Sequence, residues 1–138
     1  DLDLIVATSL ARCSGDASCP PKGAVKVYRN DIGSTRNWLK LRLHGKGEGF
    51  SNAAAIGAKV TVVAGGVRQV QEVGGGYGHF GLQHDTTLTF GTGATCGGIE
   101  VEVRWPNKEA TVQRFTGVSS GYTIDLFEGE PEPKYVVR

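Results

Sequence analysis

The sequence predicts an all-β fold, a β-sandwich or jelly-roll-like barrel of about nine or ten short strands. Short segments alternate apolar and polar residues with the period of two that is typical of half-buried strands. Glycine supplies 21 of the 138 residues, which indicates many tight turns between these segments. No segment carries a helical repeat longer than two turns. Together these features favour one β-rich core over a helical or α/β domain.

Ten segments carry the strand pattern in chain order: 2–8, 23–31, 37–45, 57–66, 67–76, 86–93, 99–106, 109–118, 121–129 and 134–138. In segment 37–45 the alternation places Leu39, Leu41 and Leu43 on one face. In segment 99–106 the residues expected to point inward are Ile99, Val101, Val103 and Trp105. Gly65 and Gly66 separate two strands by two residues, which predicts a hairpin with a two-residue primed turn.

The two ends of the chain are strand-like, and the sequence leaves their pairing partners open. An apolar strand with a free edge promotes aggregation unless it pairs. The first strand could pair with residues 24–31 of its own chain. Alternatively, it could insert into a neighbouring copy together with residues 134–138, which would build a filament by strand addition. The residues expected to act in assembly are Leu2, Leu4, Ile5, Val6, Tyr135, Val136 and Val137. Because residue 1 is not methionine, we expect it to be a processed or cut end.

The cysteines indicate an oxidising compartment. Cys13 and Cys19 bracket a short polar loop, and their spacing is not that of a C-x-x-C redox or metal motif. We therefore expect a Cys13–Cys19 disulfide and an extracellular or cell-surface location. Cys96 is left over and is expected to be a buried thiol, with a link to another chain as the alternative.

A glycine-rich loop is the candidate ligand site. Tyr77 and Phe80 are aromatic side chains on this loop and could contact a glycan or a protein. His79, His84 and Asp85 could form a set of three metal ligands, but loop histidines are usually solvated and we expect no metal here. If the chain is instead a ligand-binding module, the loop Tyr77–Asp85 is the segment expected to bind carbohydrate or protein.

Several function classes are disfavoured by composition. The 15 basic and 14 acidic residues give a net charge of +1, which provides no field for nucleic acid or an anionic membrane. No apolar run approaches the roughly 18 residues needed to span a bilayer, so membrane insertion is not expected. Ser119 and Ser120 do not lie in a nucleophile motif, and no catalytic residues or cofactors are expected.

The order of several motifs resembles the ASPIC/UnbV domain. These motifs are NWLKLRLHG, AIGAKVTVVAGGVRQVQEVGGGYG, LTFGTG, IEVEVRWPN and VQRFTGV, and the resemblance spans Asn37 to Leu126. In secreted proteins that domain follows a β-propeller of FG-GAP-type repeats, and residues 1–36 are similar to the end of such a repeat. The resemblance implies calcium only in upstream repeats, because Asp1 and Asp3 are too few ligands for this ion.

The resemblance and the strand pattern suggest three parts: residues 1–36, an ASPIC/UnbV-like domain at 37–128, and an acidic, proline-containing spacer with a terminal strand at 129–138. We expect an extracellular, non-catalytic β-domain that acts in surface adhesion or self-assembly, with itself or a neighbouring domain as its partner. The alternative is a module of a larger secreted protein that binds carbohydrate or protein.

Overall fold

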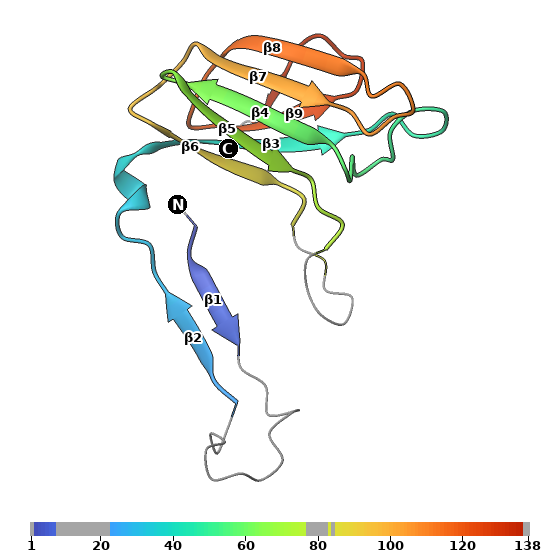
Figure 1. The fold of residues 1–138 in the computed structure, drawn as a ribbon. Coiled ribbons are helices and arrows are strands. Elements are labelled where there is room, and N and C mark those ends of the chain that lie inside the picture. The colour runs from blue at the N-terminus through green and yellow to red at the C-terminus, as the bar shows by residue number, and fades with distance from the viewer. Residues whose placement is uncertain (1, 8–22, 77–82, 84, 137–138) are drawn as a thin grey trace. The chain divides into compact units, whose positions relative to one another are not determined.

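The computed structural model describes residues 2–7, 23–76, 83 and 85–136, and the chain divides into two compact units between Thr35 and Arg36 (Figure 1). The first unit contains β1 (Leu4–Ala7), β2 (Val25–Tyr28) and a short 3-10 helix (Gly33–Thr35). The second contains β3 (Asn37–His44), β4 (Lys59–Ala64), β5 (Val67–Glu72), β6 (Leu88–Gly93), β7 (Ile99–Arg104), β8 (Val112–Val118), β9 (Thr123–Phe127) and β10 (Lys134–Val136). Each segment expected to be a strand contains one, which confirms the all-β prediction.

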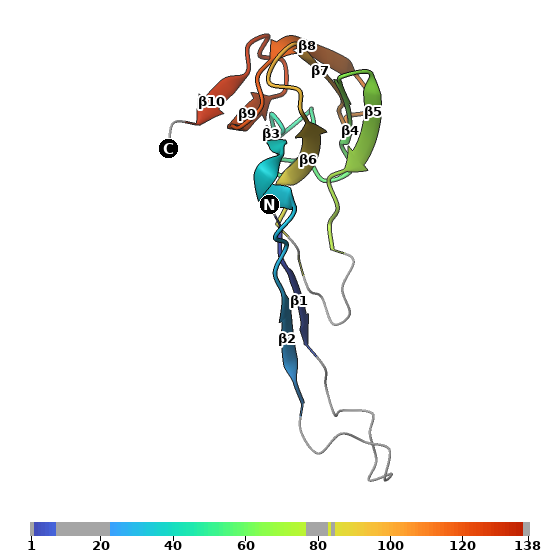
Figure 2. The same cartoon turned by 90° about the vertical axis from the view of Figure 1, so that its left-hand side faces the viewer.

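The second unit is a sandwich of two four-stranded sheets. One sheet has the order β10-β9-β3-β6 and the other the order β5-β4-β7-β8, and Figure 2 shows them as two layers. Neighbouring strands are antiparallel except β3 and β9, which run parallel with Leu41 opposite Ile124 and Leu43 opposite Leu126. The sheets do not close into a barrel, so the sandwich alternative is the correct one.

The core lies between the two sheets and follows the alternation read from the sequence. The largest fully buried side chains are Trp105, Phe90, Leu39, Leu41, Ile99, Ile124, Leu126, Val60, Val62, Val73, Val101 and Val103. The turn between β4 and β5 has positive φ at both Gly65 (56°) and Gly66 (80°), as a primed turn requires. The predicted hairpin is therefore confirmed.

Side chains tie the two sheets together along one side of the sandwich. The amides of Gln69 and Gln71 on β5 donate hydrogen bonds to the carbonyls of Gly91 and Thr89 on β6, each at 2.7 Å. β5 and β6 are edge strands of different sheets. These bonds occupy backbone acceptors of β6 that would otherwise be open to another strand.

The first unit is an antiparallel hairpin, so the first strand has its partner within the chain. In β1 and β2, Leu4 lies opposite Tyr28 and Ile5 opposite Val27. Of the two pairings considered for this strand, the structure has the one with residues 24–31. The last strand also pairs within the chain, because Tyr135 of β10 lies opposite Ile124 of β9.

Candidate functional site

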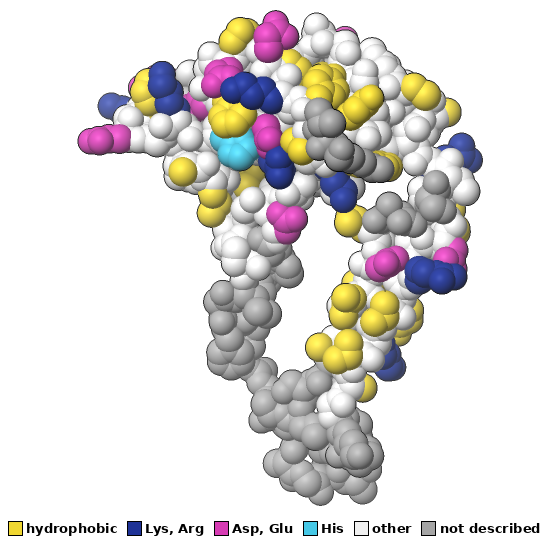
Figure 3. All heavy atoms as spheres, turned by 180° about the vertical axis from the view of Figure 1, so that it is seen from behind, with side chains coloured by type: hydrophobic (Ala, Val, Ile, Leu, Met, Phe, Trp, Pro, Cys, Tyr) yellow, Lys and Arg dark blue, Asp and Glu magenta, His cyan; other side chains and the backbone are white. Residues whose placement is uncertain are grey.

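The hairpin β1–β2 exposes an aliphatic face. Because side chains alternate along a strand, Ile5, Ala7, Val25 and Val27 share one face of the hairpin. The exposed fractions are 67% for Ile5, 68% for Val25 and 65% for Val27, and Ala7 is also exposed. Figure 3 shows hydrophobic side chains gathered along this hairpin. Among the described residues of this unit, residues 2–7 and 23–35, no side chain covers this face.

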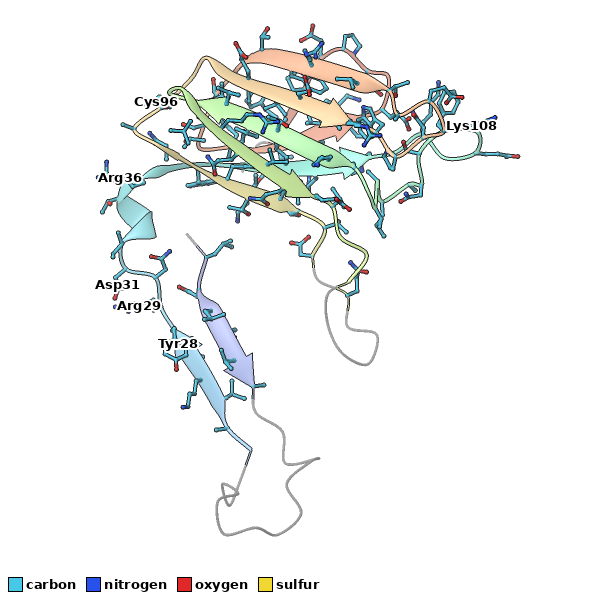
Figure 4. All side chains as sticks on the ribbon, in the orientation of Figure 1. Tyr28, Arg29, Asp31, Arg36, Cys96 and Lys108 are labelled. Atoms are coloured by element: carbon cyan, nitrogen blue, oxygen red, sulfur yellow. The ribbon has the colours of Figure 1, made fainter. Side chains whose placement is uncertain are left out.

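The opposite face of the hairpin is mixed. It carries Leu4, Val6, Lys26 and Tyr28, so a cation and a phenol lie between its aliphatic side chains. Beyond β2, Arg29 and Asp31 form an exposed ion pair, and Figure 4 shows both beside Tyr28. The two faces of the hairpin therefore differ in chemistry, and only one of them is purely aliphatic.

A buried carboxylate joins three segments at one end of the sandwich. Glu128, which follows β9, accepts hydrogen bonds at 2.9 Å from the Lys46 backbone, at 3.0 and 2.9 Å from the backbone and hydroxyl of Ser51, and at 2.7 Å from the Asn107 amide. Burial alone would raise the pKa of Glu128, but these hydrogen bonds outweigh it and hold the pKa below its usual value. All four donors favour the charged form, so this network fixes the loops around it.

A groove of about 570 Å³ opens beside this network. Its walls include residues 111–114, where β8 begins at Val112, together with Lys46 and Phe50 and the buried side chains of Trp105 and Glu128. The Phe50 ring is 52% exposed, and the Lys46 ammonium lies 4.4 Å from its centre. The groove therefore presents an aromatic ring and polar groups beside the outer strand of a sheet.

A second polar cluster lies where β3 and β9 pair. Arg42 donates two hydrogen bonds of 2.7 Å to the Asp125 carboxylate, and the His44 Nε2 donates a third at 2.9 Å. The Arg42 guanidinium is the main cause of the lowered pKa of Asp125, although burial opposes it. The His44 ring stacks on Phe127, with ring centres 4.5 Å apart, and the Lys134 ammonium lies 4.2 Å from the Phe127 ring centre. Because these groups are paired with one another, the cluster stabilises the parallel pairing of β3 and β9.

A protein-family model described as ASPIC and UnbV matches residues 48–133, which is more than half of the chain. The chain belongs to the ASPIC and UnbV family. This confirms the resemblance drawn from the strand motifs, and domains of this family are generally found in extracellular proteins. No curated protein and no solved structure matches the chain.

Residues 48–133, which match the ASPIC/UnbV model, include almost all of the groove and of the Glu128 network. Lys46 is the one residue named for these two features that lies before the match. Sequence reasoning missed Glu128, although it continues the inward alternation of Ile124 and Leu126. An acidic residue at such a position signals a buried carboxylate with hydrogen-bond donors around it.

Most of the predicted ligand loop of this ASPIC/UnbV domain lies outside the described residues. This applies to Tyr77, His79, Phe80 and His84, as it does to Cys13, Cys19 and Val137. Asp85 is described, and a hydrogen bond of 2.9 Å from the Thr87 backbone is the main cause of its lowered pKa. Among the described residues, no three histidine, cysteine or acidic side chains gather as metal ligands.

The expectation of a buried Cys96 is wrong. Its thiol is free and exposed on the loop between β6 and β7, where Figure 4 labels it. The Asn37 amide donates to its sulfur at 3.5 Å. The loop is rich in glycine and lies outside the strands, so the alternation that buries strand residues does not apply to it.

The other assembly residues occupy the hairpin and the last strand. Leu2, Leu4, Ile5 and Val6 are exposed in the first unit, while Tyr135 lies in β10 and its hydroxyl accepts a hydrogen bond from the Ser119 backbone at 3.1 Å. Val136 is half-buried at the end of β10.

In the described part of the chain, no helix has the length and apolar character required to span a membrane.

Proposed function

We propose that this chain is an extracellular, non-catalytic β-module that acts by association in surface adhesion or self-assembly, and that the hairpin β1–β2 makes the contact. The observation that carries the proposal is the aliphatic face of the hairpin. Ile5, Val25 and Val27 are each about two-thirds exposed, whereas the core of the second unit is fully buried. Contiguous exposed apolar surface of this kind marks sites of protein association.

The energetics of the hairpin support a partner. A two-stranded hairpin is at best marginally stable alone in water. Covering three aliphatic side chains that are now mostly exposed would contribute about 3–6 kcal/mol, at roughly 1.5–3 kcal/mol for each fully buried side chain. Both outer edges of this two-stranded sheet can also pair with further strands, which would add backbone hydrogen bonds. The extracellular part of the proposal is supported by the usual location of the family.

Two single substitutions on adjacent residues of β1 test the proposal. Ile5→Lys places a charge on the aliphatic face, whereas Leu4→Lys places the same charge on the mixed face at a similar exposure, 59% against 67%. Sedimentation velocity over a rising concentration series measures association, and thermal unfolding checks that the second unit is folded.

We expect the unsubstituted chain to associate reversibly, Ile5→Lys to remain monomeric and Leu4→Lys to associate nearly as well as the unsubstituted chain. A chain that is monomeric up to the highest concentration would overturn the proposal. So would an Ile5→Lys variant that associates like its Leu4→Lys control. Equal losses in both variants would contradict the assignment of the contact to the aliphatic face.

A further inference from the structure

We infer that the outer edge of β8 in a second copy of this chain receives the hairpin, so that copies join head to tail by strand addition. The inference rests on the proposed function, which assigns association to the hairpin, and it adds the surface to which the hairpin binds. Its basis is a strand edge with outward backbone groups, a groove along that edge, and the lack of an equally open edge among the other described strands of the second unit.

The pairing of β7 with β8 shows which backbone groups of β8 point outward. The Trp105 N–H donates to the Thr111 carbonyl at 2.8 Å, and the next pairs along the ladder are Arg104 with Val112, and Val103 with Gln113. In an antiparallel ladder, hydrogen-bonded and non-hydrogen-bonded pairs alternate. Val112, and likewise Arg114, therefore turn their N–H and C=O groups away from β7.

The groove lies along this part of β8. Residues 111–114 form one wall, and Phe50 and Lys46 belong to another. Val112 is 49% exposed and Phe50 is 52% exposed, so the groove offers apolar contacts next to the outward backbone groups. A strand that pairs with β8 can therefore place alternate side chains in an existing cavity, which is how strand addition achieves specificity.

The other edges of the sandwich are less open. The β6 edge is bound by Gln69 and Gln71 of β5, so these two edge strands are tied to each other. β10 has only three residues and follows Pro133, and short edges near prolines resist strand addition. β8 has seven residues and ends in the bulge at Gly117, where φ is 72°. It is the longest edge strand in the described part of the chain.

The hairpin matches this acceptor in pattern. Its strands have four residues each, which β8 can accommodate, and both of its outer edges lie at the border of its sheet. Val25 and Val27 are two residues apart, as are Ile5 and Ala7, so either strand can direct two aliphatic side chains to the groove side. Because the donor and acceptor surfaces differ, such contacts are heterologous, and they build open chains unless the rotation between copies closes them into a ring.

Val112→Pro tests the acceptor edge directly. Proline removes the outward N–H of residue 112 and places a ring at the edge, while the hydrogen bonds of β8 to β7 do not use this N–H. Val112→Ala is the matched control, because it also removes the valine side chain but keeps the N–H. Arg114→Pro with the control Arg114→Ala repeats the test at the other outward residue, and it replaces the first pair if Val112→Pro unfolds.

Mixing the two kinds of variant gives the decisive measurement. Ile5→Lys retains the β8 edge, whereas Val112→Pro retains the hairpin. We expect each variant to be monomeric alone, and an equimolar mixture to form a heterodimer of one copy of each, measured by native mass spectrometry. The unsubstituted chain and the Val112→Ala control should form longer series of oligomers.

The outcomes separate this inference from the proposed function. If Ile5→Lys abolishes association but Val112→Pro and Arg114→Pro associate like their alanine controls, the β8 acceptor is wrong and hairpin-mediated association stands. If Ile5→Lys associates like the unsubstituted chain, the proposed function itself fails. A mixture of monomeric variants that forms no heterodimer also overturns the head-to-tail arrangement.

Discussion

Replacing Glu128 by glutamine should destabilise the second unit strongly, although the two side chains have nearly the same shape. The Oε2 of Glu128 accepts from two backbone N–H groups, of Lys46 and Ser51, which cannot reverse their polarity. Glutamine must therefore keep its oxygen there and place its NH2 group where Oε1 now accepts from the Ser51 hydroxyl and the Asn107 amide. The hydroxyl can rotate to accept, but the amide of Asn107 would then face another donor.

The size of the effect follows from these contacts. The hydrogen bonds from the Lys46 and Ser51 N–H groups would go to a neutral oxygen instead of a charged one, at a cost of about 1 kcal/mol each. The Asn107 amide would face the NH2 group of glutamine, another donor, at a cost of about 1 kcal/mol. The sum is about 3 kcal/mol, which corresponds to a decrease in Tm of roughly 10–20 °C for a unit of this size. Thermal unfolding at neutral pH, followed by circular dichroism, measures this change.

Glu132→Gln is the control, because it removes the same charge from an exposed position for which the described residues show no hydrogen bond or ion pair. Its Tm should stay within about 2 °C of the unsubstituted chain, as is usual for surface substitutions. If Glu128→Gln unfolds at the same temperature as this control, the network does not hold the three segments together, and the reasoning is refuted.

Gly45→Ala should lower the free energy of unfolding by about 3 kcal/mol, because a Cβ there would lie 2.0 Å from a backbone carbonyl oxygen. Gly91→Ala is the control: no atom lies within 4 Å of its Cβ, so the free energy of unfolding should be unchanged or slightly higher. Denaturant titration of both variants measures the difference. Acid should destabilise the domain, because the lowered pKa values of Asp125 and Glu128 mean that the unfolded state binds more protons. Tm should be steady at pH values above the usual carboxyl pKa of about 4 and should fall at lower pH. In Glu128→Gln the decrease of Tm with falling pH should be less steep than in the unsubstituted chain. A maleimide should label Cys96 in the native protein, and Cys96→Ser should remove this labelled site in peptide mapping.

The sequence alone predicts the strands well, for a physical reason. A strand that is buried on one face must alternate, so Leu39, Leu41 and Leu43 mark β3 without any knowledge of its neighbours. The turn at Gly65 and Gly66 is equally local, because two consecutive residues with positive φ strongly favour glycine. Both features depend on residues within a few positions of one another.

The order of strands and the polar network depend on distant residues and could not be predicted in this way. The parallel pairing of Arg42 with Asp125 joins residues that are 83 positions apart. Glu128 was identifiable as an unusual inward acid, but its donors lie on two other segments, at Ser51 and Asn107, which only the folded chain brings together. Cys96 lies in the loop between β6 and β7, where alternation carries no information about burial.

The position of β9 beside β3 has a consequence for how the domain folds. β3 begins at Asn37 and β9 begins at Thr123, and β3 lies between β6 and β9 in its sheet. Closing so long a stretch of chain costs entropy before any contact repays it, so folding should be slow for a domain of this size. A ribosome must release the chain as far as β10 before this sheet is complete, and a product truncated before Thr123 would leave β3 without one of its neighbours.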